Sequence, residues 1–175
     1  MIDFSQDYFA LFGLPRGYRF DAARLDAAYR RLQSEVHPDR FAAAPDAQRR
    51  IALQSSARVN EAYRALKNPI ERAEYLLSLH GVDTHVETDT ALSIDFLEAQ
   101  LERREAVGEA KTHRDAHRLD DLLAQARDDI ARLERSLAEQ LDAAEWIAAR
   151  SVVRQLRFLQ KMVADIESGL QEIED

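Results

Sequence analysis

The tripeptide His37-Pro38-Asp39 is the group of residues in this sequence best suited to specific chemistry. Proline disfavours helical geometry in the residue before it, so a helix that ends at His37 leaves the imidazole and the Asp39 carboxylate in an exposed loop. By itself, such a tripeptide also fits a simple turn that stops a helix and supplies a cap. Its surroundings therefore decide which interpretation holds.

A tyrosine and two arginines precede this loop on the same predicted helix. Tyr29, Arg30 and Arg31 lie eight, seven and six residues before His37, or about two helical turns away. The two cations fall on the exposed flank of the helix. Helix and loop could therefore together engage a partner that offers an acidic groove.

A stripe of glutamates in the second half of the chain is a second candidate surface. The four residues recur at the spacing of one helix face: Glu98, Glu102, Glu105 and Glu109. Neither Glu98 nor Glu102 has a basic residue three or four positions away, so their repulsion is uncompensated locally. A solvated face is the simpler interpretation. Leu97 and Leu101 beside the stripe, with Phe158 in the last helix, instead favour an apolar patch edged by acid, which suits a partner carrying basic residues.

Composition and spacing argue against an enzyme or a metal site. The sequence contains no Cys, which excludes disulfides, thiolate metal sites and thiol nucleophiles of its own. His113 and His117 could share a helix face, but no third ligand accompanies them. No glycine-rich phosphate loop, nucleophile elbow or pair of catalytic carboxylates stands out. We therefore expect no enzyme activity, no metal and no cofactor.

The first half of the sequence predicts a helical hairpin with the His37 loop at its tip. Asp21 is a candidate N-cap for a helix that ends near His37, and the next helix begins after Pro45 with Asp46 as its candidate cap. A short helix over 8–12 precedes the hairpin. After the hairpin, the segment Asn68-Pro69-Ile70-Glu71 has the pattern of a capping box and predicts a helix that runs to Leu79.

The second half predicts an up-down-up bundle of three helices. A helix over 94–110, with Asp95 and Glu98 as a candidate capping pair, is followed by two apolar seams of near-heptad spacing over 119–141 and 146–170. Together the patterns predict an all-α protein. Its expected parts are a hairpin domain over residues 1–80, a linker over 81–92 and a three-helix bundle over 93–175.

Charge divides the chain at the same place. The net charge of −8 combines +2 for residues 1–80 with −10 for residues 81–175. This excess of acid argues against general binding of nucleic acid. The start of the chain lacks the features of a signal peptide, and no segment has the length of uninterrupted apolar residues that a membrane helix needs. We therefore expect a cytoplasmic protein that contacts other proteins.

Residues 1–80 resemble a J-domain, the module by which co-chaperones engage seventy-kilodalton heat-shock chaperones and stimulate their ATPase. The resemblance rests on Tyr29-Arg30-Arg31-Leu32, His37-Pro38-Asp39-Arg40, residues 60–66 and Arg72-Ala73-Glu74-Tyr75. Residues 7–15, 72–81 and Leu156-Arg157-Phe158-Leu159 are further similar to the HscB family, the J-domain co-chaperones of iron–sulfur cluster assembly. Because no Cys-rich zinc segment stands at the N-terminus, we expect the bacterial type of this family.

The resemblance implies two protein partners. One is an HscA-type chaperone, contacted through Tyr29, Arg30, Arg31, His37, Pro38, Asp39 and Arg40. The other is the IscU-type scaffold for iron–sulfur clusters, contacted through Leu97, Leu101, Glu102, Glu105 and Phe158. Hydrolysis of ATP would occur in the chaperone, so none of these residues is catalytic. We expect a monomer that binds IscU, delivers it to HscA and stimulates the HscA ATPase.

Two positions depart from the pattern of the family. Asp26 stands where general J-domains often have a basic residue, which favours a smaller cationic surface and a dedicated chaperone. Glu98 stands where some family members have an apolar residue, which favours a smaller apolar patch with more charge. Two alternatives stay open: a helical adaptor in which His37-Pro38-Asp39 is incidental, and a J-domain protein with another client.

Overall fold

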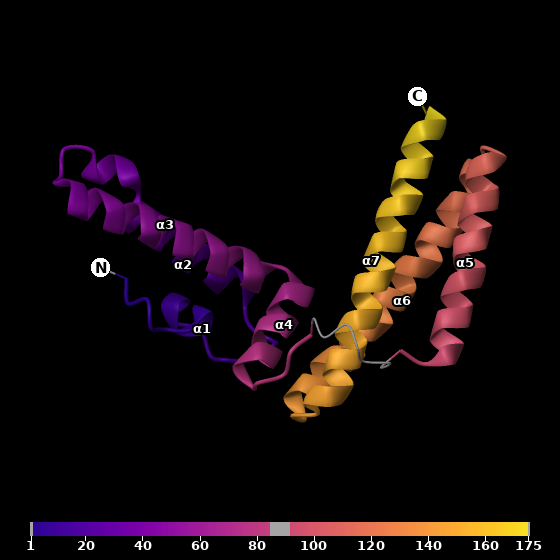
Figure 1. The fold of residues 1–175 in the computed structure, drawn as a ribbon, viewed down its shortest axis with the longest axis horizontal. Coiled ribbons are helices and arrows are strands. Elements are labelled where there is room, and N and C mark those ends of the chain that lie inside the picture. Colours follow the sequence, from indigo (N-terminus) through magenta and orange to yellow (C-terminus); the bar gives the residue numbers. More distant parts are fainter. Residues whose placement is uncertain (1, 85–91, 175) are drawn as a thin grey trace. The chain divides into compact units, whose positions relative to one another are not determined.

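The computed structural model of the protein describes residues 2–84 and 92–174, and its regular elements are helices throughout (Figure 1). This confirms the predicted all-α class. The chain forms two compact units, residues 1–76 and 77–175. Residues 85–91, which make up most of the predicted linker, lie outside the described residues.

The first unit begins with a short helix, α1 (Tyr8–Phe12), that is fixed at both ends. The Asp7 carboxylate accepts a hydrogen bond from the Ala10 amide at 2.9 Å, as the side chain of an N-cap does. Gly13 ends the helix in a left-handed conformation with φ of 65°, which glycine adopts without steric cost. Four of the five helical residues are buried, so packing stabilises a helix too short to form alone.

A hairpin of two helices with a short 3-10 helix at its tip forms the centre of the first unit (Figure 1). Its elements are α2 (Ala22–Val36), η1 (Pro38–Phe41) and α3 (Asp46–Lys67). The Asp21 carboxylate caps α2 by accepting from the Ala23 amide at 2.9 Å. The helix stops one residue before His37, because Pro38 disfavours helical geometry there. The loop that carries His37 therefore lies at the tip of the hairpin, as the sequence predicts.

The predicted cap of α3 is wrong. Asp46 is the first helical residue, and Pro45 occupies the cap position without a side-chain hydrogen bond. Proline has no amide hydrogen to satisfy and its φ, −55° here, already suits the start of a helix. Asp46 forms an ion pair with Arg49 instead, and its negative charge lies in the first turn, where the helix dipole favours it.

Apolar and aromatic contacts hold the hairpin together. Leu25, Val59 and Leu66 have no exposed surface. The rings of Tyr29 and Tyr63 stack with their centroids 4.0 Å apart and so join α2 to α3 directly. Because these side chains face one another, the charged residues of both helices remain on the outer faces of the hairpin.

The next helix, α4 (Pro69–Leu79), has the predicted bounds and the predicted Asn68 cap. The Asn68 Oδ1 atom accepts from the amides two and three residues further on, at 2.9 and 3.2 Å. Tyr75 of this helix stacks on Tyr8 with centroids 4.1 Å apart, and its hydroxyl accepts from the Tyr8 amide at 3.0 Å. These contacts bind α4 to α1 within the first unit.

The second unit contains the three long helices that the sequence predicts (Figure 1). They are α5 (Ile94–Thr112), α6 (Ala116–Asp142) and α7 (Trp146–Glu174). Leu119, Leu137 and Leu156 are completely buried in the bundle. An ion pair of 2.6 Å between Arg103 and Asp129 joins α5 to α6 beside this core.

The predicted cap of α5 is also wrong. Ser93 caps the helix, because its hydroxyl accepts a hydrogen bond from the Phe96 amide at 3.2 Å. Asp95 lies inside the first turn, where its charge is favourable to the helix dipole. The helix therefore begins at Ile94, as predicted, but serine supplies the hydrogen bond.

Candidate partner-binding sites

The His37-Pro38-Asp39 loop is exposed and ordered by its own hydrogen bond. The Nδ1 atom of His37 accepts from the Asp39 amide at 3.3 Å and lies 3.6 Å from the Asp39 Oδ2 atom. The His37 side chain is 54% exposed and that of Asp39 is 89% exposed. One ring nitrogen is thus engaged inside the loop, while the other nitrogen and the carboxylate remain available to a partner.

Arg40 anchors the loop to the helix before it. Its Nη1 atom donates a hydrogen bond to the carbonyl oxygen of Ser34 at 2.9 Å. Carbonyl groups in the last turn of a helix lack partners within the helix, so this guanidinium satisfies one of them. Arg40 stands in our prediction as a contact to the chaperone, and the structure adds that it positions the loop.

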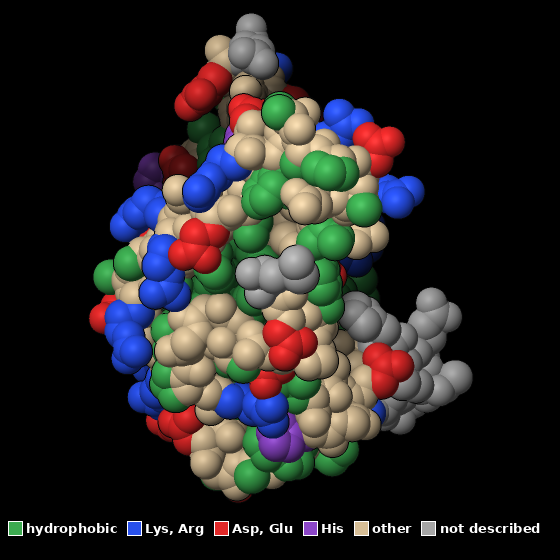
Figure 2. Space-filling model, turned by 90° about the vertical axis from the view of Figure 1, so that its left-hand side faces the viewer, with side chains coloured by type: hydrophobic (Ala, Val, Ile, Leu, Met, Phe, Trp, Pro, Cys, Tyr) green, Lys and Arg blue, Asp and Glu red, His purple; other side chains and the backbone are tan. Residues whose placement is uncertain are grey.

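The other predicted chaperone contacts lie on α2 and differ in burial. Tyr29 is half-buried, stacks on Tyr63 and donates to the Asn60 Oδ1 atom at 3.0 Å, so it supports the hairpin. Arg30 and Arg31 are exposed and form no ion pair with another described residue. Lys and Arg side chains gather along one side of the face shown in Figure 2. Because both are exposed, the two arginines can attract an acidic partner.

α5 presents three large apolar side chains to solvent. Ile94, Leu97 and Leu101, here called the apolar patch, are 72%, 45% and 59% exposed. Their i, i+3, i+7 spacing places them on one helix face. Single exposed apolar residues are common on protein surfaces, but a contiguous group marks an interaction site. Sequence reasoning named Leu97 and Leu101 but missed Ile94, although the same spacing would have found it.

Phe158 of α7 supports this region from below the surface. It is half-buried, packs against the bundle core and meets Phe96 of α5 edge to face, with ring centroids 6.0 Å apart. Its removal would therefore disturb packing between α5 and α7 as well as any surface contact. Leu97 and Leu101 are the better positions at which to test binding alone.

The predicted glutamate stripe lies exposed along α5. Its four members form no ion pair with any other residue in the described ranges: Glu98, Glu102, Glu105 and Glu109. Their mutual repulsion is small, about 0.2–0.5 kcal/mol for each pair, but nothing in the described part of the bundle offsets it. The glutamates therefore form an acidic edge beside the apolar patch. A partner with basic side chains would relieve their repulsion, so this edge suits such a partner.

Metal and membrane sites find no support in the described ranges. Among residues 2–84 and 92–174, no group of three His, Cys, Asp or Glu side chains could hold a metal ion. His117 instead lies 3.4 Å from Asp121, and the ring of His113 contacts the Glu109 carbonyl oxygen at 2.8 Å. None of the described helices is long and apolar enough to cross a membrane.

Family comparisons cover both units. Residues 7–75 match the family model described as the DnaJ domain, and residues 92–167 match the one described as the HSCB C-terminal oligomerisation domain. A helical hairpin with His37-Pro38-Asp39 at its tip agrees with the first of these matches. The fold and the loop thus define the class of protein, which is a co-chaperone with a J-domain.

Individual relatives identify the family within this class. A co-chaperone protein HscB homolog of Cupriavidus taiwanensis is 49% identical over 169 residues, which are 97% of this chain and 96% of the relative. The chaperone HscB structure from Vibrio cholerae has a TM-score of 0.86 and 34% identity, over 96% of this chain and 99% of that one. Human co-chaperone HscB has a TM-score of 0.90 and 26% identity, over 99% and 85%. The chain belongs to the HscB family.

Proposed function

We propose that this co-chaperone serves iron–sulfur cluster assembly by carrying an IscU-type scaffold protein to an HscA-type chaperone and by stimulating that chaperone's ATPase. One observation carries the proposal. A single chain combines the exposed J-domain loop with an exposed apolar patch whose acidic edge is unpaired. Two unlike surfaces on one chain suit a protein that must hold two different partners.

The first surface acts on the chaperone. Arg30 and Arg31 attract an acidic groove, while His37 and Asp39 supply hydrogen-bonding groups held in place by Arg40. Stimulation follows if this surface binds the hydrolysis-competent state of the chaperone more tightly than the other state. The reacting atoms belong to the chaperone, so this chain is not an enzyme and uses no metal or cofactor of its own.

The second surface holds the scaffold. Leu97 and Leu101 offer apolar area that is already exposed and therefore gains from burial against a partner. Glu102 and Glu105 beside them attract basic side chains, and Phe158 supports α5 from α7.

The protein acts in the cytoplasm as a monomer with one site for each partner. Sedimentation of the purified chain measures its oligomeric state directly.

A steady-state ATPase assay of a cognate HscA-type chaperone tests the proposal. We expect the co-chaperone and the scaffold together to stimulate the ATPase more than the sum of their separate effects. His37→Gln should abolish stimulation by the co-chaperone alone. Leu97→Ala with Leu101→Ala should keep that stimulation but weaken scaffold binding in calorimetry about tenfold or more, because both substitutions remove apolar area that the scaffold would bury.

The same assay separates the alternatives. Both leucines are exposed, so each substitution should change the free energy of unfolding by no more than about 0.5 kcal/mol, which thermal unfolding checks. A wild-type chain that fails to stimulate the chaperone would indicate an adaptor with an incidental loop. Normal stimulation without any heat of scaffold binding would indicate a J-domain protein for another client.

A further inference from the structure

A hollow of about 240 Å³ lies between α5 and α7 in the second unit. Its lining residues, which define what we call the basic pocket, are Arg104, Val107, Phe158, Lys161, Met162 and Asp165. Val107 and Met162 are buried members of the bundle core, and Phe158 packs against that core. The inner wall of the pocket is therefore apolar, while its ionisable groups come from both helices.

The positive charges of the pocket are not compensated. Arg104 and Lys161 are exposed, and neither forms an ion pair with another residue of the described ranges. Both stand in the half of the chain in which 22 acidic residues outnumber 12 basic ones. Two unpaired cations from different helices beside an apolar wall form a site for a carboxylate.

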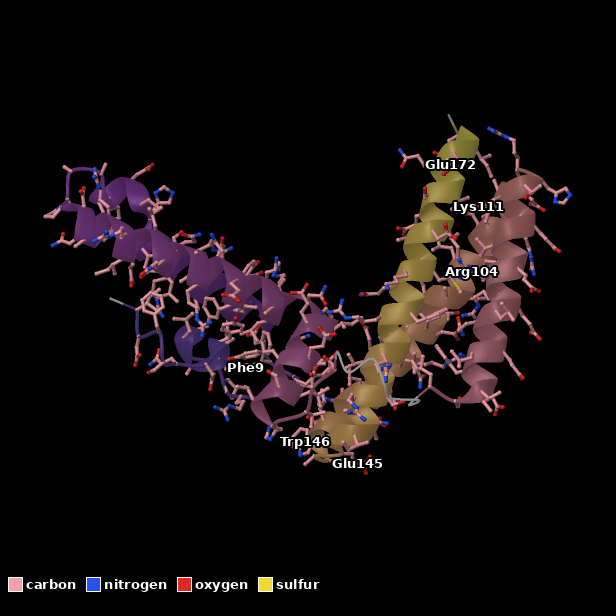
Figure 3. All side chains as sticks on the ribbon, viewed as in Figure 1. Phe9, Arg104, Lys111, Glu145, Trp146 and Glu172 are labelled. Carbon is pink, nitrogen blue, oxygen red and sulfur yellow. The ribbon has the colours of Figure 1, made fainter. Side chains whose placement is uncertain are left out.

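The acidic residue in the pocket lining already forms an ion pair within the bundle. The Asp165 Oδ1 atom lies 2.5 Å from Lys111 Nζ. The stem of Lys111 crosses α7 at Gly169, where a Cβ atom would lie only 2.5 Å from the Lys111 Cε atom. Figure 3 shows Lys111 and Arg104 on the same helix, α5, one above the other. Because Asp165 is paired with Lys111, its carboxylate does not cancel the positive charges of Arg104 and Lys161.

The basic pocket adjoins the apolar patch on the side opposite the glutamates. Successive residues turn by about 100° around a helix, so Arg104 falls to one side of Leu97 and Leu101, whereas Glu105 falls to the other. Phe158 lines the pocket and also contacts Phe96, the residue of α5 that directly precedes Leu97. The apolar patch thus has an acidic edge and a basic edge.

We propose that the basic pocket receives an acidic side chain of the scaffold protein, bound by Arg104 and Lys161, and that it thereby sets the orientation of the scaffold on α5. This inference rests on the proposed function and adds the chemistry of the bound partner. A scaffold that offers a basic group to Glu102 and Glu105 and a carboxylate to the pocket can bind in only one direction, since the reverse orientation opposes like charges.

Charge reversal tests the pocket in the full-length protein. Titration calorimetry with the IscU-type scaffold measures binding to Arg104→Glu with Lys161→Glu. We expect binding to weaken about tenfold or more, because a favourable contact becomes a repulsion. The matched control is Arg118→Glu with Arg135→Glu, which makes the same change of charge at two exposed arginines of α6 that form no ion pair within the described ranges. We expect the control to bind as the wild type does.

The results distinguish failure of the pocket from failure of the proposed function. Equal binding by the reversed pair and its control, together with weakened binding by Leu97→Ala with Leu101→Ala, would overturn the pocket and leave the scaffold surface standing. Equal weakening by the reversed pair and the control would also overturn it, because net charge alone would then explain the effect. A wild-type chain that does not bind the scaffold would overturn the proposed function itself.

Discussion

Asp26 stands where general J-domains often have a basic residue, and it changes the charge of the α2 surface. Its carboxylate accepts hydrogen bonds from Lys67 Nζ at 2.7 and 2.9 Å and from the Tyr63 hydroxyl at 3.0 Å. The Asp26 carboxylate therefore forms an ion pair with Lys67 of α3. The cationic surface proposed for the chaperone is thus limited to the residues nearer the loop.

These contacts predict how Asp26 titrates. The hydrogen bonds from Lys67 and then from Tyr63 hold the pKa of the Asp26 carboxyl below its ordinary value. An acid with a lowered folded-state pKa contributes stability above its unfolded pKa, about 3.9, and loses this contribution as the pH falls through the folded value. Asp26→Asn should therefore be less stable than the wild type at pH 7, and the gap should close below about pH 4.

Urea unfolding at several pH values measures this gap. Asp120→Asn is the control, because Asp120 is exposed and forms no ion pair within the described ranges. It should differ little from the wild type at any pH. A constant difference between Asp26→Asn and the wild type from pH 7 to pH 3 would contradict the proposed ionic role of Asp26.

At the level of single residues, the sequence predicted the loop but not its internal contacts. Pro38 makes the end of α2 at Val36 predictable, because its steric effect is local. The hydrogen bond from Arg40 to the Ser34 carbonyl depends on how η1 folds back, which no spacing rule states. The unpaired state of Arg104 and Lys161 likewise depends on where Lys111 lies, and Lys111 is distant from Asp165 in the sequence.

Four helices, α1, α4, α5 and α6, end in turns of one kind that differ in the residue at the left-handed position. In each turn, the amide of the residue after this position bonds the carbonyl five residues before it, as in a Schellman motif. The left-handed residues are Gly13, Gly81, Arg114 and Ala144, with φ between 53° and 75°. Only the two glycines occupy this conformation without steric cost.

Glycine substitutions should therefore have opposite effects in different places. Gly81→Ala should destabilise the protein by about 1 kcal/mol, because alanine is strained at a φ of 75°. Gly108→Ala should stabilise it by up to about 1 kcal/mol, because Gly108 lies inside α5 and an added Cβ would meet no atom within 4 Å. Chemical unfolding compares the two variants, and destabilisation by both would contradict this account.

The two bundle turns allow the reverse experiment. Ala144→Gly should stabilise the protein by roughly 0.5 kcal/mol, since relief of the left-handed strain exceeds the added entropy of the unfolded chain. The same measurement of unfolding free energy applies. A lower stability for Ala144→Gly would show that the alanine methyl group makes a contact worth more than the strain.

At the level of elements, the periodicity of apolar residues predicted the long helices and a capping box predicted α4, whereas the predicted caps of α3 and α5 were wrong. Asp46 and Asp95 both lie one or two positions inside their helices, where acids are as favourable as at the cap. Composition alone cannot separate these positions. Pro45 and Ser93 take the cap positions because backbone geometry, rather than residue preference, decides which residue stands outside the first turn.

Across the whole molecule, the net charge of −8 is the sum of two unlike halves, +2 for residues 1–80 and −10 for residues 81–175. The first unit carries exposed arginines on α2 and the second carries the glutamate stripe on α5. Linkage on one chain raises the effective concentration of one partner near the other. Delivery of the scaffold to the chaperone, as proposed, therefore requires both surfaces on the same molecule.

Mixing two defective variants tests this requirement most directly. His37→Gln should hold the scaffold without engaging the chaperone, and Leu97→Ala with Leu101→Ala should engage the chaperone without holding the scaffold. We predict that the mixture, assayed with scaffold, chaperone and ATP, stimulates the ATPase no more than the leucine variant does in the same assay without the His37→Gln variant. Recovery of the full wild-type stimulation by the mixture would show that the two surfaces work on separate molecules and would contradict the central claim.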